Sequence, residues 1–219
     1  MIGLALVLLA AQARGANRYV VMPLSRPVAH FSIGTTSLLN ALLWLGRDER
    51  IGFGIEFPGN ELDRDVRVEA DRGTVRDVLN KILSPADAYQ ISVSNGVILI
   101  RKKGVKPPAW LDHRLPLFDL PRMELMSANA GLGMRLEMDL DPSLKGFLGD
   151  MPVTDPIDNV GPIHARGRTV RQLLIGIVAA SRGASWFPTT WEVRFSFPAS
   201  INPFWTLVTY SARTTKRPE

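Results

Sequence analysis

The phrase Thr-Val-Arg-Asp-Val-Leu at residues 74–79 is the strongest guide to the fold, because a close copy, Thr-Val-Arg-Gln-Leu-Leu, stands at residues 169–174. In each copy the threonine is a competent helix N-cap, and the residue three positions later, Asp77 or Gln172, can complete a capping box. A short extended run precedes each copy, and an aromatic residue followed by a strand-like run comes after it. The sequence therefore predicts two related strand–helix–strand units.

The residues around the first copy predict a helix, a hairpin and further strands. Apolar residues at helical spacing predict a helix over 37–50, and strict alternation over 51–57 predicts a half-buried strand. Asn95-Gly96 between two apolar runs is a strong signal for a hairpin. The predicted order is strand, helix, strand, strand, helix and hairpin, at residues 28–33, 37–50, 51–57, 66–70, 74–83 and 89–101.

The second copy lies in a block with weaker signals. Residues 102–108 form a basic, proline-containing linker, after which strands are predicted over 114–118, 134–140, 163–165, 191–197 and 205–210. Residues 141–162 are predicted to be a long loop, and Gly183 can end the helix that Thr169 begins. The predicted fold class is α+β, with two small sandwich-like domains at 26–104 and 112–210 and a disordered tail at 211–219.

The composition is that of an ordinary globular protein with mild positive charge. The chain has 219 residues, a net charge of +5 and no cysteine, which excludes disulfides and cysteine-based metal sites. Residues 2–11 form an uninterrupted apolar run, and Ala11-Gln12-Ala13 at the end of residues 1–13 has the small-residue pattern of a signal-peptide cleavage site. We therefore expect export to the periplasm or cell envelope, and a buried first segment is the alternative. No segment of the mature chain is predicted to span the membrane.

The stretch from Phe31 to Arg101 resembles the short N-terminal domain shared by secretins and TonB-dependent receptors. The phrases that carry the resemblance are Leu-Leu-Asn-Ala-Leu-Leu-Trp-Leu at 38–45, Ile-Gly-Phe-Gly-Ile at 51–55, Val-Arg-Val-Glu-Ala at 66–70, the phrase at 74–79, and Asn-Gly-Val-Ile-Leu-Ile at 95–100. The resemblance implies a small periplasmic α+β domain that binds other proteins. In the receptors such domains signal to an inner-membrane regulator, and in secretins they face the inner-membrane assembly.

The expected function is therefore non-enzymatic protein–protein interaction in the cell envelope, as an adaptor or signalling module. The expected partner is an envelope protein, either an inner-membrane regulator or an outer-membrane or secretion component, with no role for nucleic acid. The chain departs from the family in that nothing after Arg101 looks like a secretin ring or a receptor barrel. Trp44, Arg47 and Asp48 are the predicted protein-binding residues, because Trp44 lies off the leucine stripe of its helix and is expected to be partly exposed.

A search for chemistry predicts no catalytic residue, no cofactor-binding residue and no metal ligand. The histidines, His30, His113 and His164, have no metal-site spacing, and the chain contains no phosphate-binding glycine loop and no nucleophile elbow. The tryptophans at 44, 110, 186, 191 and 205 are read mainly as packing residues.

Two other functions stay open at this point. One is intracellular nucleic-acid binding, suggested by the basic charge, although the lysines and arginines are spread along the chain. The other is an envelope enzyme that uses the 141–164 segment, where Asp150, Asp155 and His164 are the polar candidates.

Overall fold

The computed structural model describes residues 22–57, 59–140, 159–181, 184–188 and 205–208. It is a mixed α+β fold. The strands are β1 (Pro27–Ser37), β2 (Phe53–Glu56), β3 (Asp65–Thr74), β4 (Tyr89–Ser94), β5 (Val97–Lys102), β6 (Arg114–Leu120), β7 (Met123–Glu124), β8 (Asn159–Val160), β9 (Ile163–Thr169), β10 (Ser185–Pro188) and β11 (Trp205–Val208). The α-helices are α1 (Leu38–Glu49), α2 (Gly59–Leu62), α3 (Val75–Ile82), α4 (Leu125–Leu140) and α5 (Val170–Ala180), and the 3-10 turns are η2 (Pro23–Ser25), η3 (Ala86–Ala88) and η4 (Ala109–Asp112).

A five-stranded sheet lies at the centre, in the order β11-β10-β2-β5-β4. Strand β2 runs parallel to both of its neighbours, β5 and β10, whereas β4 and β11 are antiparallel to the strands they pair with. This sheet includes strands from both sides of residues 102–108. Among the described residues there are also three two-stranded sheets, namely β1–β3, β6–β9 and β7–β8.

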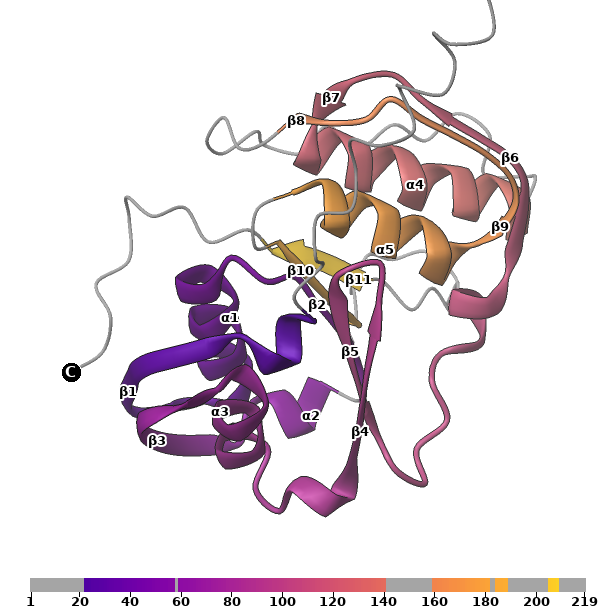
Figure 1. Cartoon of the computed structure of the whole chain (residues 1–219). Helices are drawn as coiled ribbons and strands as arrows, with labels where there is room; N and C mark the ends of the chain where they lie inside the picture. The colour runs from indigo at the N-terminus through magenta and orange to yellow at the C-terminus, as the bar shows by residue number, and fades with distance from the viewer. Residues whose placement is uncertain (1–21, 58, 141–158, 182–183, 189–204, 209–219) are drawn as a thin grey trace, which may run out of the picture.

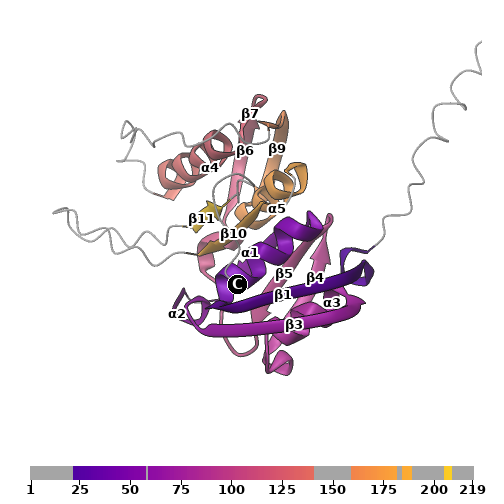
Figure 2. The same cartoon turned by 90° about the vertical axis from the view of Figure 1, so that its left-hand side faces the viewer.

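The elements are stacked in layers on both sides of the central sheet (Figure 1). On one side lie α1 and α3, covered in turn by the β1–β3 ribbon, and on the other side lie α5 and α4, covered by the β6–β9 ribbon. Figure 2 shows the β1–β3 ribbon crossing in front of the first-half helices. Each half therefore covers its side of the sheet with two helices and a two-stranded ribbon, and the halves meet at one sheet.

The side chains of β5 show how one sheet serves two cores. Ile98 and Ile100 belong to a first core with α1 and α3, whereas Val97 and Leu99 belong to a second core with α4 and α5. Successive strand residues point to opposite faces, so an uninterrupted apolar run indicates a strand buried on both faces. Strand β2 is likewise buried at all four positions, and the prediction of a half-buried strand over 51–57 is wrong for that reason.

The repeated phrase begins a helix in each half, as predicted. In α3 the hydroxyl of Thr74 accepts from the Asp77 amide, and the Asp77 carboxylate accepts from the Thr74 amide. In α5 Thr169 and Gln172 make the same reciprocal pair. Each box satisfies amides that the first helical turn leaves without intrahelical partners.

The strand predicted at 134–140 is wrong, because these residues form the end of α4. The residues of α4 that are buried against the second core are Leu125, Ala128, Leu132 and Leu136, which recur at helical spacing. The alternation of Met134, Leu136, Met138 and Leu140 is not matched by burial, because only Leu136 of the four is buried and Leu140 is exposed.

Other predictions divide between confirmed ones and ones that fall outside the described residues. The helix at 37–50, the hairpin about Asn95-Gly96 and a strand beginning at Trp205 are confirmed, and the strand at 66–70 extends over Asp65–Thr74. The signal peptide at 1–13, Gly183, the strand at 191–197 and the tail at 211–219 lie outside the residues that the structure describes.

Candidate functional site

The predicted protein-binding residues lie together at the end of α1, but Trp44 is not exposed as expected. Trp44 is 4% exposed and packs in the first core, and the guanidinium of Arg47 lies over its ring at 4.6 Å from the centroid. The helix thus covers its own tryptophan with an arginine one turn later, a cation–π contact. Asp48 is exposed and Arg47 is half-buried.

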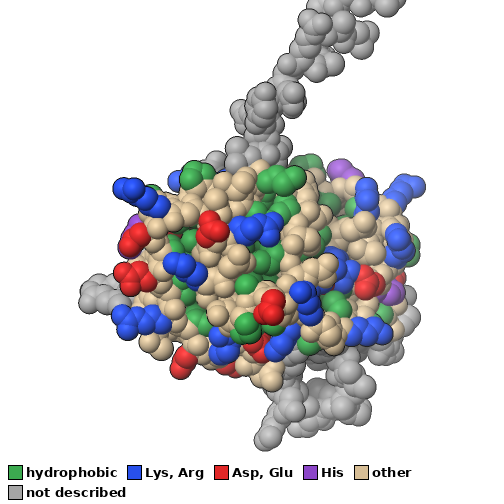
Figure 3. Space-filling model, turned by 60° about the horizontal axis from the view of Figure 1, so that its bottom comes forward, with side chains coloured by type: hydrophobic (Ala, Val, Ile, Leu, Met, Phe, Trp, Pro, Cys, Tyr) green, Lys and Arg blue, Asp and Glu red, His purple; other side chains and the backbone are tan. Residues whose placement is uncertain are grey.

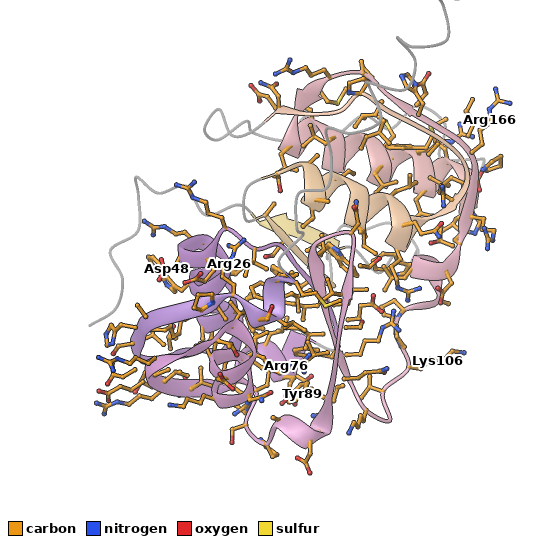
Figure 4. All side chains as sticks on the ribbon, in the orientation of Figure 1. Arg26, Asp48, Arg76, Tyr89, Lys106 and Arg166 are labelled. Atoms are coloured by element: carbon orange, nitrogen blue, oxygen red, sulfur yellow. The ribbon has the colours of Figure 1, made fainter. Side chains whose placement is uncertain are left out.

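Two further charged residues complete this end of the helix. Arg26, which precedes β1, donates a hydrogen bond to the backbone carbonyl of Glu49. Burial raises the pKa of Glu49 above its ordinary value, against the lowering effect of Arg26. Figure 4 shows Arg26 and Asp48 at the same end of α1. We call Arg26, Arg47, Asp48 and Glu49 the α1-end surface.

A buried ion cluster, which the sequence analysis did not find, lies where the two halves meet. Glu56 at the end of β2 is 0% exposed and accepts hydrogen bonds from Arg101 at 2.8 and 3.3 Å and from Arg171 Nε at 2.8 Å. Arg171 also pairs with Asp112. Burial opposes the charge of Arg171, but hydrogen bonds to Glu56 and Asp112 raise its pKa above the ordinary value. The cluster joins β2 and β5 of the first half to α5 and η4 of the second.

The signal for this cluster was present in the sequence but ambiguous. Glu56 stands between Ile55 and Phe57 in a short apolar strand, and a carboxylate in such a strand points either to water or to a buried cation. The choice depends on Arg171, which is far away in the sequence.

A second polar cluster joins α2 to β4 and β5. Glu61 on α2 accepts hydrogen bonds from Lys102 Nζ at 2.5 Å and from Tyr89 Oη at 2.7 Å. These bonds hold the pKa of Glu61 below its ordinary value. Burial and the bond to Glu61 raise the pKa of Tyr89 to about 12. In both clusters each carboxylate is matched by neighbouring cations, so the arrangement ties secondary-structure elements together.

Each histidine of the chain pairs with an aspartate. His30 Nδ1 lies 2.6 Å from Asp71 across the β1–β3 ribbon, and His164 pairs with Asp119 across the β6–β9 ribbon. His113 Nε2 lies 2.6 Å from Asp139 at the end of α4. Within the described residues no group of three or more His, Asp or Glu side chains could hold a metal ion.

The structure describes only some of the residues behind the two alternative functions. His164 is exposed on β9, whereas Asp150 and Asp155 fall outside the residues that the structure describes. Arg166 projects outward from the same strand (Figure 4), and Lys106 lies in the connection between β5 and η4. Figure 3 shows basic and acidic side chains interspersed over one face of the molecule. Across the described part of the chain, no helix has the length and apolar character needed to span a membrane.

Comparison with known proteins found no matching family model, no matching curated protein and no matching solved structure.

Proposed function

We propose that this chain is a non-enzymatic protein-interaction module of the bacterial cell envelope, acting as an adaptor or signalling domain. The first half is similar in its sequence phrases to the short N-terminal domain of secretins and TonB-dependent receptors. The single observation that carries the proposal is the order β1, α1, β2, β3, α3 and the β4–β5 hairpin, with β1 paired to β3 and β2 paired to β5. This order is the one that the phrases of residues 31–101 imply.

The polar residues inside the fold support binding as the function more than catalysis. Glu56 and Glu61 are occupied by arginine, lysine and tyrosine side chains that belong to the fold itself. A catalytic carboxylate instead needs access to a substrate within hydrogen-bonding distance. These groups serve the scaffold, and the surface is left to carry the function.

The docking surface in this proposal is the α1-end surface. Arg47 is half-buried and stacked on Trp44, which holds its guanidinium in one place and lowers the side-chain entropy lost on binding. An arginine supported by an aromatic ring is a common hot spot of protein interfaces. Trp44 thus acts through Arg47, while Arg47 and Asp48 contact an envelope partner directly. The partner is an inner-membrane regulator or an outer-membrane or secretion component.

The test is site-specific photo-crosslinking in a Gram-negative host that expresses the full chain. A photoreactive residue in place of Asp48 is expected to capture an envelope protein, and Arg47→Ala in the same chain is expected to reduce the capture. The matched control carries the photoreactive residue in place of Asn80, which is exposed on α3. Fractionation and the mass of the mature chain report export in the same cells.

Equal capture by the photoreactive residues at positions 48 and 80 would refute this function. A chain that stays in the cytoplasm with its first residue intact would refute it as well.

A further inference from the structure

The outer edge of β4 is an open strand edge that lacks the usual protection. In the part of the chain that the structure describes, β4 pairs with β5 on one side and with no strand on the other. Strand edges in natural proteins are protected by charged side chains, prolines or bulges. The sequence of β4, Tyr-Gln-Ile-Ser-Val-Ser, contains no charge and no proline, and its pairing with β5 is regular over all six residues.

The other long strands in the two ribbons carry that protection. The exposed positions of β3 include Arg67, Glu69 and Asp71, and those of β9 include Arg166 and Arg168. Strand β6 contains Pro116. Strand β1 has an irregularity of register between Ile33 and Thr36. Compared with these ribbon strands, β4 is an edge suited to pairing.

The free backbone groups of β4 can be assigned from its hydrogen-bonding phase. The Lys103 amide donates to the Ala88 carbonyl at 2.8 Å, so Ala88 and Lys103 form a hydrogen-bonded pair. Paired residues in an antiparallel ladder alternate between hydrogen-bonded and non-hydrogen-bonded positions. The carbonyls of Tyr89, Ile91 and Val93 and the amides of Ile91 and Val93 therefore point to the outer edge. The amide of Tyr89 is already used, because it donates to the Ala86 carbonyl in η3.

We propose that β4 pairs with β4 of a second copy of this chain, antiparallel and about a two-fold axis at Ile91. A copy turned by this two-fold axis matches the Ile91 amide with the Ile91 carbonyl of the other copy and the Val93 amide with the Tyr89 carbonyl, so both free amides find an acceptor. Tyr89 then lies opposite Val93 of the second copy, an aromatic–β-branched pair that favours antiparallel pairing. The two central sheets become one sheet that continues through the dimer.

The side chains of β4 suit a second copy on both faces of the strand. Ile91 and Val93 are partly buried against the first core, and pairing removes more of their apolar surface from water. On the other face Gln90 lies opposite Ser92 of the second copy, and both are exposed in the single chain. A strand that meets its own copy would face like charges if it carried any, and this strand has none. Two-fold dimers are also the commonest closed assembly of soluble proteins.

The first test is the oligomeric state of the full chain by sedimentation velocity over a concentration series. We expect a species of twice the 24.2 kDa chain mass. The variant Gln90→Lys with Ser92→Lys places lysines opposite one another twice across the axis and is expected to weaken self-association by roughly tenfold or more. The matched control, Ala29→Lys with Thr35→Lys, adds the same charge at exposed positions of β1 and should leave self-association unchanged.

A second test uses the absence of cysteine from the chain. In the proposed register, residues 90 and 92 of the two copies form non-hydrogen-bonded pairs with Cα atoms about 4.5 Å apart, within the range that a disulfide spans. The variant Gln90→Cys with Ser92→Cys should therefore give a covalent dimer under mild oxidation. The proposal is overturned by a monomer at every concentration, by a dimer that the two β4 lysines do not weaken, or by failure of the cysteines to link. Capture of another protein's extended segment by a monomeric chain would also overturn it.

Discussion

The replacement Glu56→Gln tests how the two halves are held together. Glu56 is fully buried and accepts three charge-assisted hydrogen bonds from Arg101 and Arg171. Glutamine keeps the volume, but it removes the negative charge and turns an amide donor toward guanidinium donors. Because removing one partner of a buried ion pair costs about 3–5 kcal/mol, we expect the free energy of unfolding to fall by that amount at neutral pH.

Arg101 and Arg171 should contribute unequally to the free energy of unfolding. Arg171 is 14% exposed and Arg101 is 33% exposed at the side chain, so Arg171 depends more on Glu56 for compensation of its charge. Arg171→Met leaves Glu56 paired with Arg101, and we expect a loss of about 1.5–3 kcal/mol, the worth of hydrogen bonds to a charged group. Asp112→Asn removes an exposed partner of Arg171 and should cost under about 1 kcal/mol.

The assay is urea unfolding of the full chain, followed by tryptophan fluorescence. It covers the wild type, the three single variants, and the double variant Glu56→Gln with Arg171→Met. Direct contact between Glu56 and Arg171 predicts a coupling energy of about 1–3 kcal/mol in the resulting double-mutant cycle. Unchanged dependence on urea concentration would show that the same surface is exposed on unfolding. A loss below about 1 kcal/mol for Glu56→Gln, as for an exposed ion pair, would refute the reasoning.

Two further predictions concern packing and pH. Gly54→Ala should lower the free energy of unfolding by about 1–3 kcal/mol, because its new Cβ would lie 2.6 Å from Leu99 and 2.7 Å from Trp186 on a strand that is packed on both faces. The control Gly176→Ala adds a Cβ in open space on α5 and should raise the free energy of unfolding by about 1 kcal/mol. Thermal unfolding of both variants measures these changes. Because the pKa of Glu61 is lowered in the folded state, its stabilising contribution is complete above its ordinary pKa of 4.5 and is lost as the pH falls through the folded value. Urea midpoints measured from neutral pH down through this window should therefore fall less in Glu61→Gln than in the wild type, and parallel curves would contradict the assignment.

Much of the local structure follows from the residues alone. Both capping boxes, the hairpin at Asn95-Gly96 and helix α1 depend on residues a few positions apart, whose interactions are decided within the segment. The same local reasoning gave a strand over 134–140, where a short alternation agreed with one period and the burial of α4 followed another. A short apolar run cannot separate helix from strand when its partners are unknown.

The candidate site shows the same division. The sequence located Trp44, Arg47 and Asp48 on one helix, yet the burial of Trp44 depends on the first core and on Arg47 lying over its ring. The amphipathic stripe of a helix predicts which side faces the core, but it does not tell how far the neighbouring elements extend around the helix.

By itself, the sequence determined the α+β class, the duplicated capped helix and the apolar strands, because these depend on periodicity and on contacts within a few residues. The tertiary structure alone decided that β10 joins β2, that β2 is thereby buried on both faces, and that Glu56 meets Arg171 from the other half. These features depend on pairs of residues more than a hundred positions apart. Such pairs form only when the packing of both cores brings them together, and no local pattern in the sequence records that packing.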